Sequence, residues 1–132
     1  MPVTLTVRDE STTGSVGEAI TLTFPTETIT VRELIRERVY QEVQDFNRAK
    51  DQSHFKGLVQ PTDAEVSLNG FTLKKRREID WKAQFERACD AYAKNRVLVL
   101  VGDRQTESLD ETITITRGVD VSFLKLVPLV GG

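Results

Sequence analysis

An amphipathic helix with a well-marked start constrains this chain most, because its apolar stripe must be covered by a sheet or another helix. Thr30 and Glu33 form a capping box, in which the Thr30 hydroxyl accepts from the Glu33 amide and the Glu33 side chain reaches back. Ile29 and Leu34 flank the box as a hydrophobic staple, which predicts a helix from Val31 to about Arg48. Six residues at helical spacing form its apolar stripe: Val31, Leu34, Ile35, Val39, Val43 and Phe46.

Two segments of alternating apolar and polar residues precede this helix and predict two strands. Their apolar positions are Val3, Leu5 and Val7 in the first segment and Ile20, Leu22 and Phe24 in the second. Residues 9–17 form a polar turn between them, so the second strand should return antiparallel to the first. Pro25 ends the second strand.

Residues 47–95 are expected to form an inserted hairpin and a second helix. Asn69-Gly70 suits the turn of a hairpin between two short apolar segments. Asp80 can cap a helix that stops near Asn95. One face of that helix carries Trp81, Phe85, Ala88, Cys89 and Tyr92. These side chains are too apolar to stay in water, so we expect the helix to dock on the core or to support self-association with a second copy.

The residues after this helix predict the rest of the sheet. Val97–Val101 is apolar at every position, which indicates a strand inside the sheet. A last strand should begin near Val119, where apolar and polar residues alternate again. We expect five residues to pack together under the first helix: Leu5, Leu22, Leu34, Leu100 and Phe123.

Composition places the chain among ordinary globular domains. It has 132 residues with a net charge of -2, which suits one domain and offers no argument for nucleic acid or an acidic membrane surface. No apolar run approaches the ~20 residues that span a bilayer, and no signal peptide is recognisable. A single cysteine, Cys89, fits a cytoplasmic location.

Residues that could carry catalysis are sparse. His54 and Cys89 are the one histidine and the one cysteine, too few for a zinc site, and Cys89 shares a helix face with aromatic residues as a small core residue. The basic run Lys74–Arg77 lacks interleaved aromatic residues and is expected to be a solvated turn. No glycine-rich phosphate loop is present. We therefore expect no enzyme activity and no cofactor.

The final segment ends in Val130-Gly131-Gly132, after Pro128 has interrupted the strand. We expect residues 128–132 to be extended and flexible, with Gly131 and Gly132 slender enough to enter a catalytic channel. Leu129 is the side chain that a partner should grip, with Pro128 and Val130 on either side. The simpler interpretation is that two glycines merely form a frayed end.

The order of these elements resembles ubiquitin and its relatives. Residues 3–46 look like the first half of that fold, and residues 96–132 look like its third strand through its di-glycine tail. The resemblance implies an α+β, ubiquitin-like β-grasp, a mixed four- to five-stranded sheet with one packed helix. Residues 1–132 would form a single domain, with an insertion at about 47–95 and a flexible tail at 128–132.

The resemblance also implies a function. The Gly132 carboxylate would be adenylated by an ATP-using activating enzyme, passed on as a thioester and conjugated to target proteins. Pro128 and Val130 stand where ubiquitin's tail has arginines, which implies a dedicated activating enzyme. The ending looks like that of ubiquitin-like proteins from bacterial conjugation operons, which implies a conjugating enzyme, a deubiquitinase-like peptidase and a role in antiviral defence.

Two other functions remain open from the sequence. Small sulfur carriers share this fold and its di-glycine end, and there Gly132 would become a thiocarboxylate. A non-covalent ubiquitin-like binding module would use the folded surface alone. Whether Gly132 is encoded last or exposed by processing also stays open.

Overall fold

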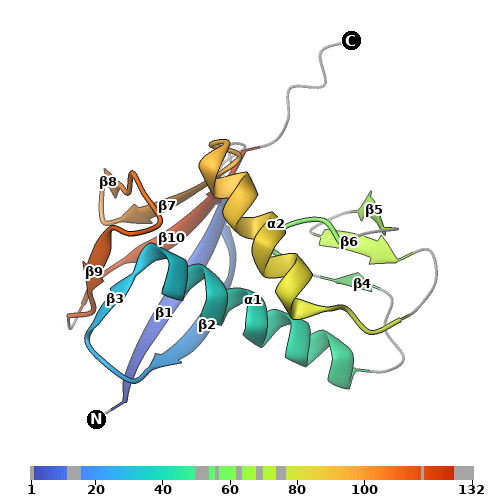
Figure 1. Cartoon of the computed structure of the whole chain (residues 1–132), viewed down its shortest axis with the longest axis horizontal. Coiled ribbons are helices and arrows are strands. Elements are labelled where there is room, and N and C mark those ends of the chain that lie inside the picture. The colour runs from blue at the N-terminus through green and yellow to red at the C-terminus, as the bar shows by residue number, and fades with distance from the viewer. Residues whose placement is uncertain are drawn as a thin grey trace.

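The structure is a computed structural model, and it describes residues 2–11, 16–49, 54–55, 57–61, 64–67, 70–73, 77–116 and 118–126. These residues form a mixed α+β fold around a five-stranded sheet, ordered β2-β1-β10-β7-β8 (Figure 1). Its strands are β1 (Val3–Ser11), β2 (Val16–Phe24), β7 (Val97–Val101), β8 (Arg104–Gln105) and β10 (Val121–Lys125). The β1–β10 pair is parallel, and the other neighbours are antiparallel.

Helix α1 (Val31–Arg48) crosses one face of this sheet (Figure 1). The predicted start is confirmed, since Thr30 Oγ1 accepts a hydrogen bond from the Glu33 amide at 3.1 Å. All six residues of the predicted stripe are buried. Arg38 is buried with them, although its charge would place it on the polar face of an isolated helix.

Two small sheets flank the main one. β3 (Thr28–Thr30) pairs antiparallel with β9 (Thr112–Thr114) just before α1 begins. The insertion forms a sheet of β4 (His54–Phe55), β6 (Gly70–Leu73) and β5 (Ala64–Ser67), in that spatial order. Ser67 pairs with Gly70, which confirms the hairpin, while its turn at 68–69 lies outside the described residues, as does the basic run up to position 76.

Helix α2 (Trp81–Ala93) packs against α1 and β7, so the insertion docks on the core of its own chain. Asp80 caps it, and its Oδ1 accepts from the Lys82 amide at 3.1 Å. Asn95, with φ of 59°, adopts the left-handed conformation that ends many helices. Among the described residues, no helix is long and apolar enough to cross a membrane.

The predicted core is confirmed at four of its five positions. Leu5, Leu22, Leu34 and Phe123 are at most 3% exposed between α1 and the sheet. The prediction for Leu100 is wrong: it is half-buried and pairs with Ser122. Val99 faces the core, and successive side chains of a strand point to opposite faces of the sheet. Leu100 therefore lies on the face away from α1.

Candidate functional site

The chain leaves the main sheet at the C-terminal end of β10. Lys125 pairs with Val97 there, and the Leu126 amide donates to the Arg96 carbonyl at 3.0 Å. These contacts define the root of the tail, residues 125–126, as part of the folded body. The predicted recognition and conjugation residues lie beyond it, outside the described residues, so they remain predictions: Pro128, Leu129, Val130, Gly131 and Gly132.

Lys125 joins three separate parts of the fold at this root. Its Nζ donates to the Gly57 carbonyl at 3.0 Å and lies 3.4 Å from Asp9 Oδ2. Gly57 is needed there, because a Cβ at that position would stand 2.0 Å from a ring carbon of Phe55. The last residue of β10 is thus bonded to both β1 and the insertion.

Beneath Lys125 lies an ion-pair network centred on Arg38, whose side chain is 0% exposed. Its two terminal nitrogens bond the two carboxylate oxygens of Asp9, one of them at 2.7 Å, and its Nε donates to Glu42 at 2.9 Å. The guanidinium carbon lies 4.9 Å from the centre of the Phe123 ring. Bidentate pairing and stacking of this kind suit arginine and not lysine.

The pKa values in this network follow from burial and pairing. Burial acts against the charged form of Asp9, yet the hydrogen bond and charge of Arg38, helped by Lys125, hold the Asp9 pKa below its usual value. Burial likewise opposes the charge of Arg38, and the charges of Glu42 and Asp9 outweigh it and raise the Arg38 pKa. For Glu42 burial prevails over Arg38 and raises the pKa of that carboxyl.

The segment 57–60 of the insertion is held by side chains from all around it. Besides Lys125, Glu42 Oε1 accepts from the Leu58 amide at 3.0 Å, and Gln84 Nε2 donates to the Val59 carbonyl at 3.1 Å. These bonds come from β10, α1 and α2 respectively. The insertion is therefore fixed beside the tail root instead of hanging from the fold.

The outer face of the sheet, away from α1, carries a second feature. Leu98, Leu100 and Leu124 are half-buried there, and Leu98 pairs directly with Leu124 across β7 and β10. We call these three residues the leucine patch. Isolated exposed leucines are ordinary, but neighbours on one sheet face form a surface that a partner can cover. Leu124 lies on the strand that leads into the tail, and Leu98 and Leu100 lie on its neighbour β7.

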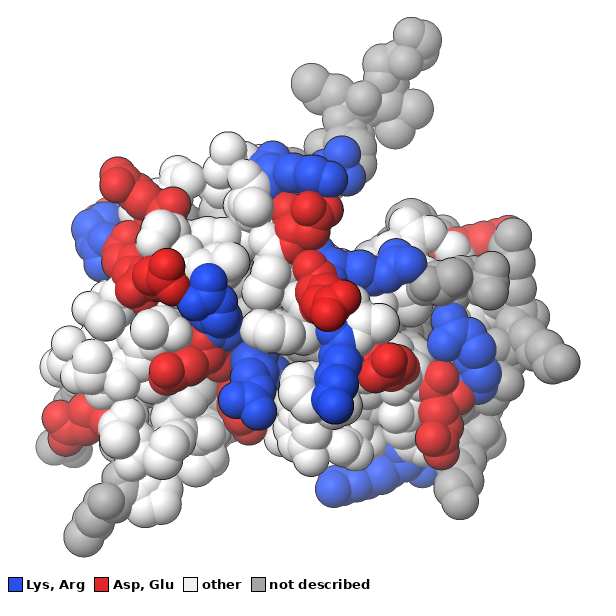
Figure 2. Space-filling model, in the orientation of Figure 1, with Lys and Arg blue, Asp and Glu red and all other residues white. Residues whose placement is uncertain are grey.

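Aromatic residues mark the opposite surface, where α1 meets α2. Tyr40 and Trp81 stack edge to face with ring centres 5.3 Å apart, and Arg36 lies 5.7 Å from the Trp81 ring. Over the visible helix face, basic and acidic side chains are interspersed (Figure 2). No large area of that face therefore carries charges of a single sign.

Cys89 and His54 are the other residues of a type that could carry catalysis. Cys89 is half-buried on α2, where burial raises its thiol pKa and so disfavours a reactive thiolate. His54 lies on β4, in a different part of the insertion. Within the described ranges, no group of three or more His, Cys, Asp and Glu residues could hold a metal ion.

The sequence prediction missed two features, the leucine patch and the Arg38 network. The patch had a detectable pattern, since leucines occupy one parity of Val97–Val101 and valines the other. The network had only a partial one: Arg38 and Glu42 are four residues apart on α1, but Asp9 and Lys125 are far from them in sequence and each looks like an ordinary surface charge. Only the packing of α1 on the sheet brings them together.

Comparisons with known proteins add no identity to this geometry: no family model matches the chain, and no curated protein or solved structure was found to be similar to it.

Proposed function

We propose that this chain is a ubiquitin-like β-grasp modifier, whose Gly132 carboxylate is activated and joined to target proteins. The observation that carries the proposal is the position of β10. It lies between β1 and β7, parallel to β1, and its C-terminal end leads towards Gly131-Gly132. A mixed sheet of this order with α1 across one face supports the β-grasp assignment.

The chemistry would take place on the tail, in the active sites of partner enzymes. The Gly132 carboxylate attacks the α-phosphorus of ATP and pyrophosphate leaves, giving an acyl adenylate. An enzyme cysteine thiolate then displaces AMP to form a thioester, and a target amine displaces the thiolate to form an amide. Two glycines suit a narrow channel, because neither places a Cβ beside the reacting carbonyl.

The folded body would supply the recognition that this chemistry needs. The Lys125 contacts and the bond from Leu126 fix where the tail leaves the sheet, so an enzyme holding the body would find the tail at a defined position. The leucine patch offers an apolar surface on that strand and its neighbour β7. The partners of the protein in this proposal are a dedicated ATP-using activating enzyme, a conjugating enzyme and a deubiquitinase-like peptidase, all in the cytoplasm.

The test uses the lysine at the tail root. Trypsin cuts after Lys125, so a modified target lysine would retain the remnant Leu-Val-Pro-Leu-Val-Gly-Gly, residues 126–132. An affinity-tagged chain ending at Gly132 is expressed in cells of its source, and tryptic digests are searched for this remnant by mass spectrometry. The matched control lacks Gly132 and keeps the folded body. The proposal is supported if remnant-bearing peptides are found in cells that express the full chain and not in cells that express the control. It is contradicted if neither sample contains them.

The leucine patch favours a second candidate, a non-covalent binding module that uses the folded surface alone. In that case Leu98→Ser should abolish partner binding, whereas loss of Gly132 should leave it unchanged. The sulfur-carrier function is separated by intact mass, since sulfur would replace one oxygen of the unconjugated chain.

A further inference from the structure

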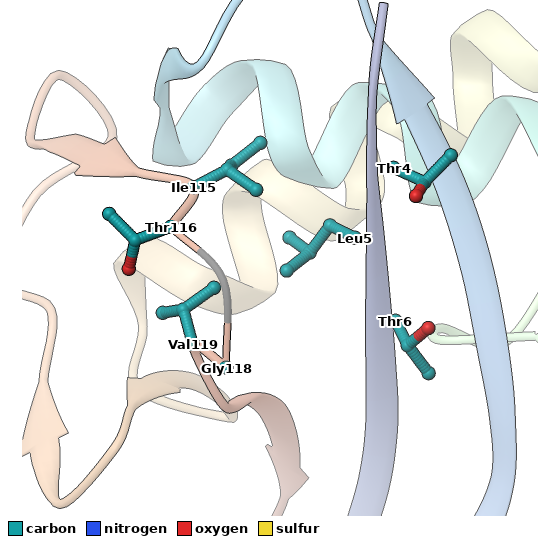
Figure 3. A pocket seen from close by; sticks show the side chains of 7 residues that line it. All are labelled: Thr4, Leu5, Thr6, Ile115, Thr116, Gly118 and Val119. Atoms are coloured by element: carbon teal, nitrogen blue, oxygen red, sulfur yellow. The ribbon is translucent and has the colours of Figure 1, made fainter.

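A slot opens in the main sheet beside the N-terminal half of β1 (Figure 3). β10 pairs with β1 only from Val7 onward, so Val3–Thr6 pair with β2 on one side and with no described strand on the other. The far wall of the slot is formed by Ile115, Thr116, Gly118 and Val119. The gap has a volume of about 290 Å³.

The far wall stands away from β1 because the chain before β10 is held elsewhere. The Ile115 amide donates to the Glu27 carbonyl at 2.7 Å, which keeps this residue beside the β3–β9 pair. A turn follows, closed by a 3.0 Å bond from the Val119 amide to the Thr116 carbonyl. Gly118, with φ of 84°, supplies the left-handed conformation that this turn requires. The slot is therefore built by the local fold.

The lining indicates the chemistry of an occupant. Leu5, Ile115 and Val119 give apolar walls, whereas the side chains of Thr4 and Thr6 project from β1 on the side away from Ile115 and Val119 (Figure 3). In an extended strand, alternate residues point their N–H and C=O groups to one side, so Val3–Thr6 present backbone groups to the slot. An open edge of this kind accepts an extended peptide as an added strand. The volume is at the small end for ligand pockets, which favours a short segment.

We infer that this slot receives the tail of a second copy of the chain, residues 126–132, with Leu129 inserted between the apolar walls. This segment carries no charged side chain, and Pro128 favours the extended backbone that an added strand requires. Pro128 also lacks an amide donor, which is tolerated in an edge position. The segment begins at Leu126, the last described residue, and the rest of it follows directly in the sequence.

The same copy cannot supply the tail, because it is too short to turn back. The slot lies beyond the first residue of β10, and the five residues from Leu126 back to Val121 span about 17 Å at 3.3 Å per residue. Leu129, three residues past Leu126, reaches at most about 11 Å. Insertion must therefore come from another molecule. The contact joins two different surfaces and so builds closed rings or open chains of copies.

This association goes beyond the proposed function, because it needs no activation of Gly132. The first experiment titrates the synthetic peptide Leu-Val-Pro-Leu-Val-Gly-Gly into isotope-labelled full-length chain and follows NMR shifts. Saturable shifts of the Val3–Thr6 amides and the Leu5, Ile115 and Val119 methyl groups are expected. A peptide N-methylated at Leu129 and Gly131 keeps the side chains but loses two donors, and it should bind at least tenfold more weakly. Shifts confined to the leucine patch, or none at millimolar peptide, would overturn the inference.

The second experiment measures sedimentation of the full chain over a range of concentrations. Wild type should associate as concentration rises, and Leu129→Asp, which changes the tail and leaves the folded body intact, should remain monomeric. Val119→Trp, which fills the slot, should also remain monomeric. Ala19→Trp is the matched control, since it adds the same side chain at an exposed position on β2 outside the slot. Association of Leu129→Asp equal to that of wild type would contradict the inference, whether or not Val119→Trp folds.

Discussion

Arg38 and Asp9 form a two-pronged ion pair, in which Nη2 lies 2.7 Å from Oδ2 and the Arg38 side chain is wholly buried. The pair joins the middle of α1 to β1, under the strand that leads to the tail. A buried arginine is tolerable only while its donors are satisfied, here by Asp9 and Glu42. The network therefore specifies how α1 sits on the sheet more than it adds to the stability of the fold.

Removing one member of this network should destabilise the fold, because buried charges lose their partner. Arg38→Met leaves Glu42 without its cation and Asp9 with Lys125 alone, so the free energy of unfolding should fall by ~3–5 kcal/mol. Chemical denaturation measures this loss. A triple variant that adds Asp9→Asn and Glu42→Gln should recover most of it, since no buried unpaired carboxylate then remains and Lys125 is partly solvated. A loss below ~1 kcal/mol for Arg38→Met alone would mean that Arg38 is not buried as described.

Asp9 should also make stability depend on acid pH. Its pKa is lowered in the folded chain, so its contribution is complete above the unfolded pKa near 3.8 and is lost as pH falls through the folded pKa. Between about pH 4 and pH 2, wild type should lose stability more steeply than Asp9→Asn, which has no carboxyl to protonate. Urea unfolding at several pH values measures both slopes, and parallel slopes would contradict the pairing.

Neighbouring residues of β7 should respond very differently to one substitution. Val99 is 0% exposed on the core face of the sheet, so Val99→Ser should cost more than ~3 kcal/mol through a cavity and a buried hydroxyl. Leu98 is half-buried on the outer face, so Leu98→Ser should cost only about 1 kcal/mol. Thermal and urea unfolding of the two variants provide the comparison. Equal losses would mean that the leucine patch is covered by other parts of the protein.

Trp81 should contribute to stability within one molecule. It is half-buried against Tyr40, so Trp81→Ala should lower the free energy of unfolding by roughly 1.5–3 kcal/mol. Trp81→Phe, which keeps an aromatic ring, should lose less. Sedimentation profiles of both variants should match that of wild type. A shift of Trp81→Ala alone toward monomer would instead assign Trp81 to a contact between copies.

The boundaries of α1 and the strands near it were predictable from the sequence, because their causes are local. The Thr30 box acts over one helical turn, and alternation in Val3–Val7 acts over neighbouring residues. The hairpin before Leu73 followed from turn chemistry in the same way. These features require no knowledge of what packs against them.

The sequence by itself determined the capped helix, the alternating strands and an uncharged tail that ends in glycines. Only the tertiary structure decided which face of Leu100 and Leu98 is covered, since strand periodicity separates two faces but does not say which one meets α1. It also decided that Arg38 is buried, because its carboxylate partner Asp9 comes from another element 29 residues away. Burial and charge pairing depend on contacts between segments that are far apart in sequence, and these contacts form only in the folded chain.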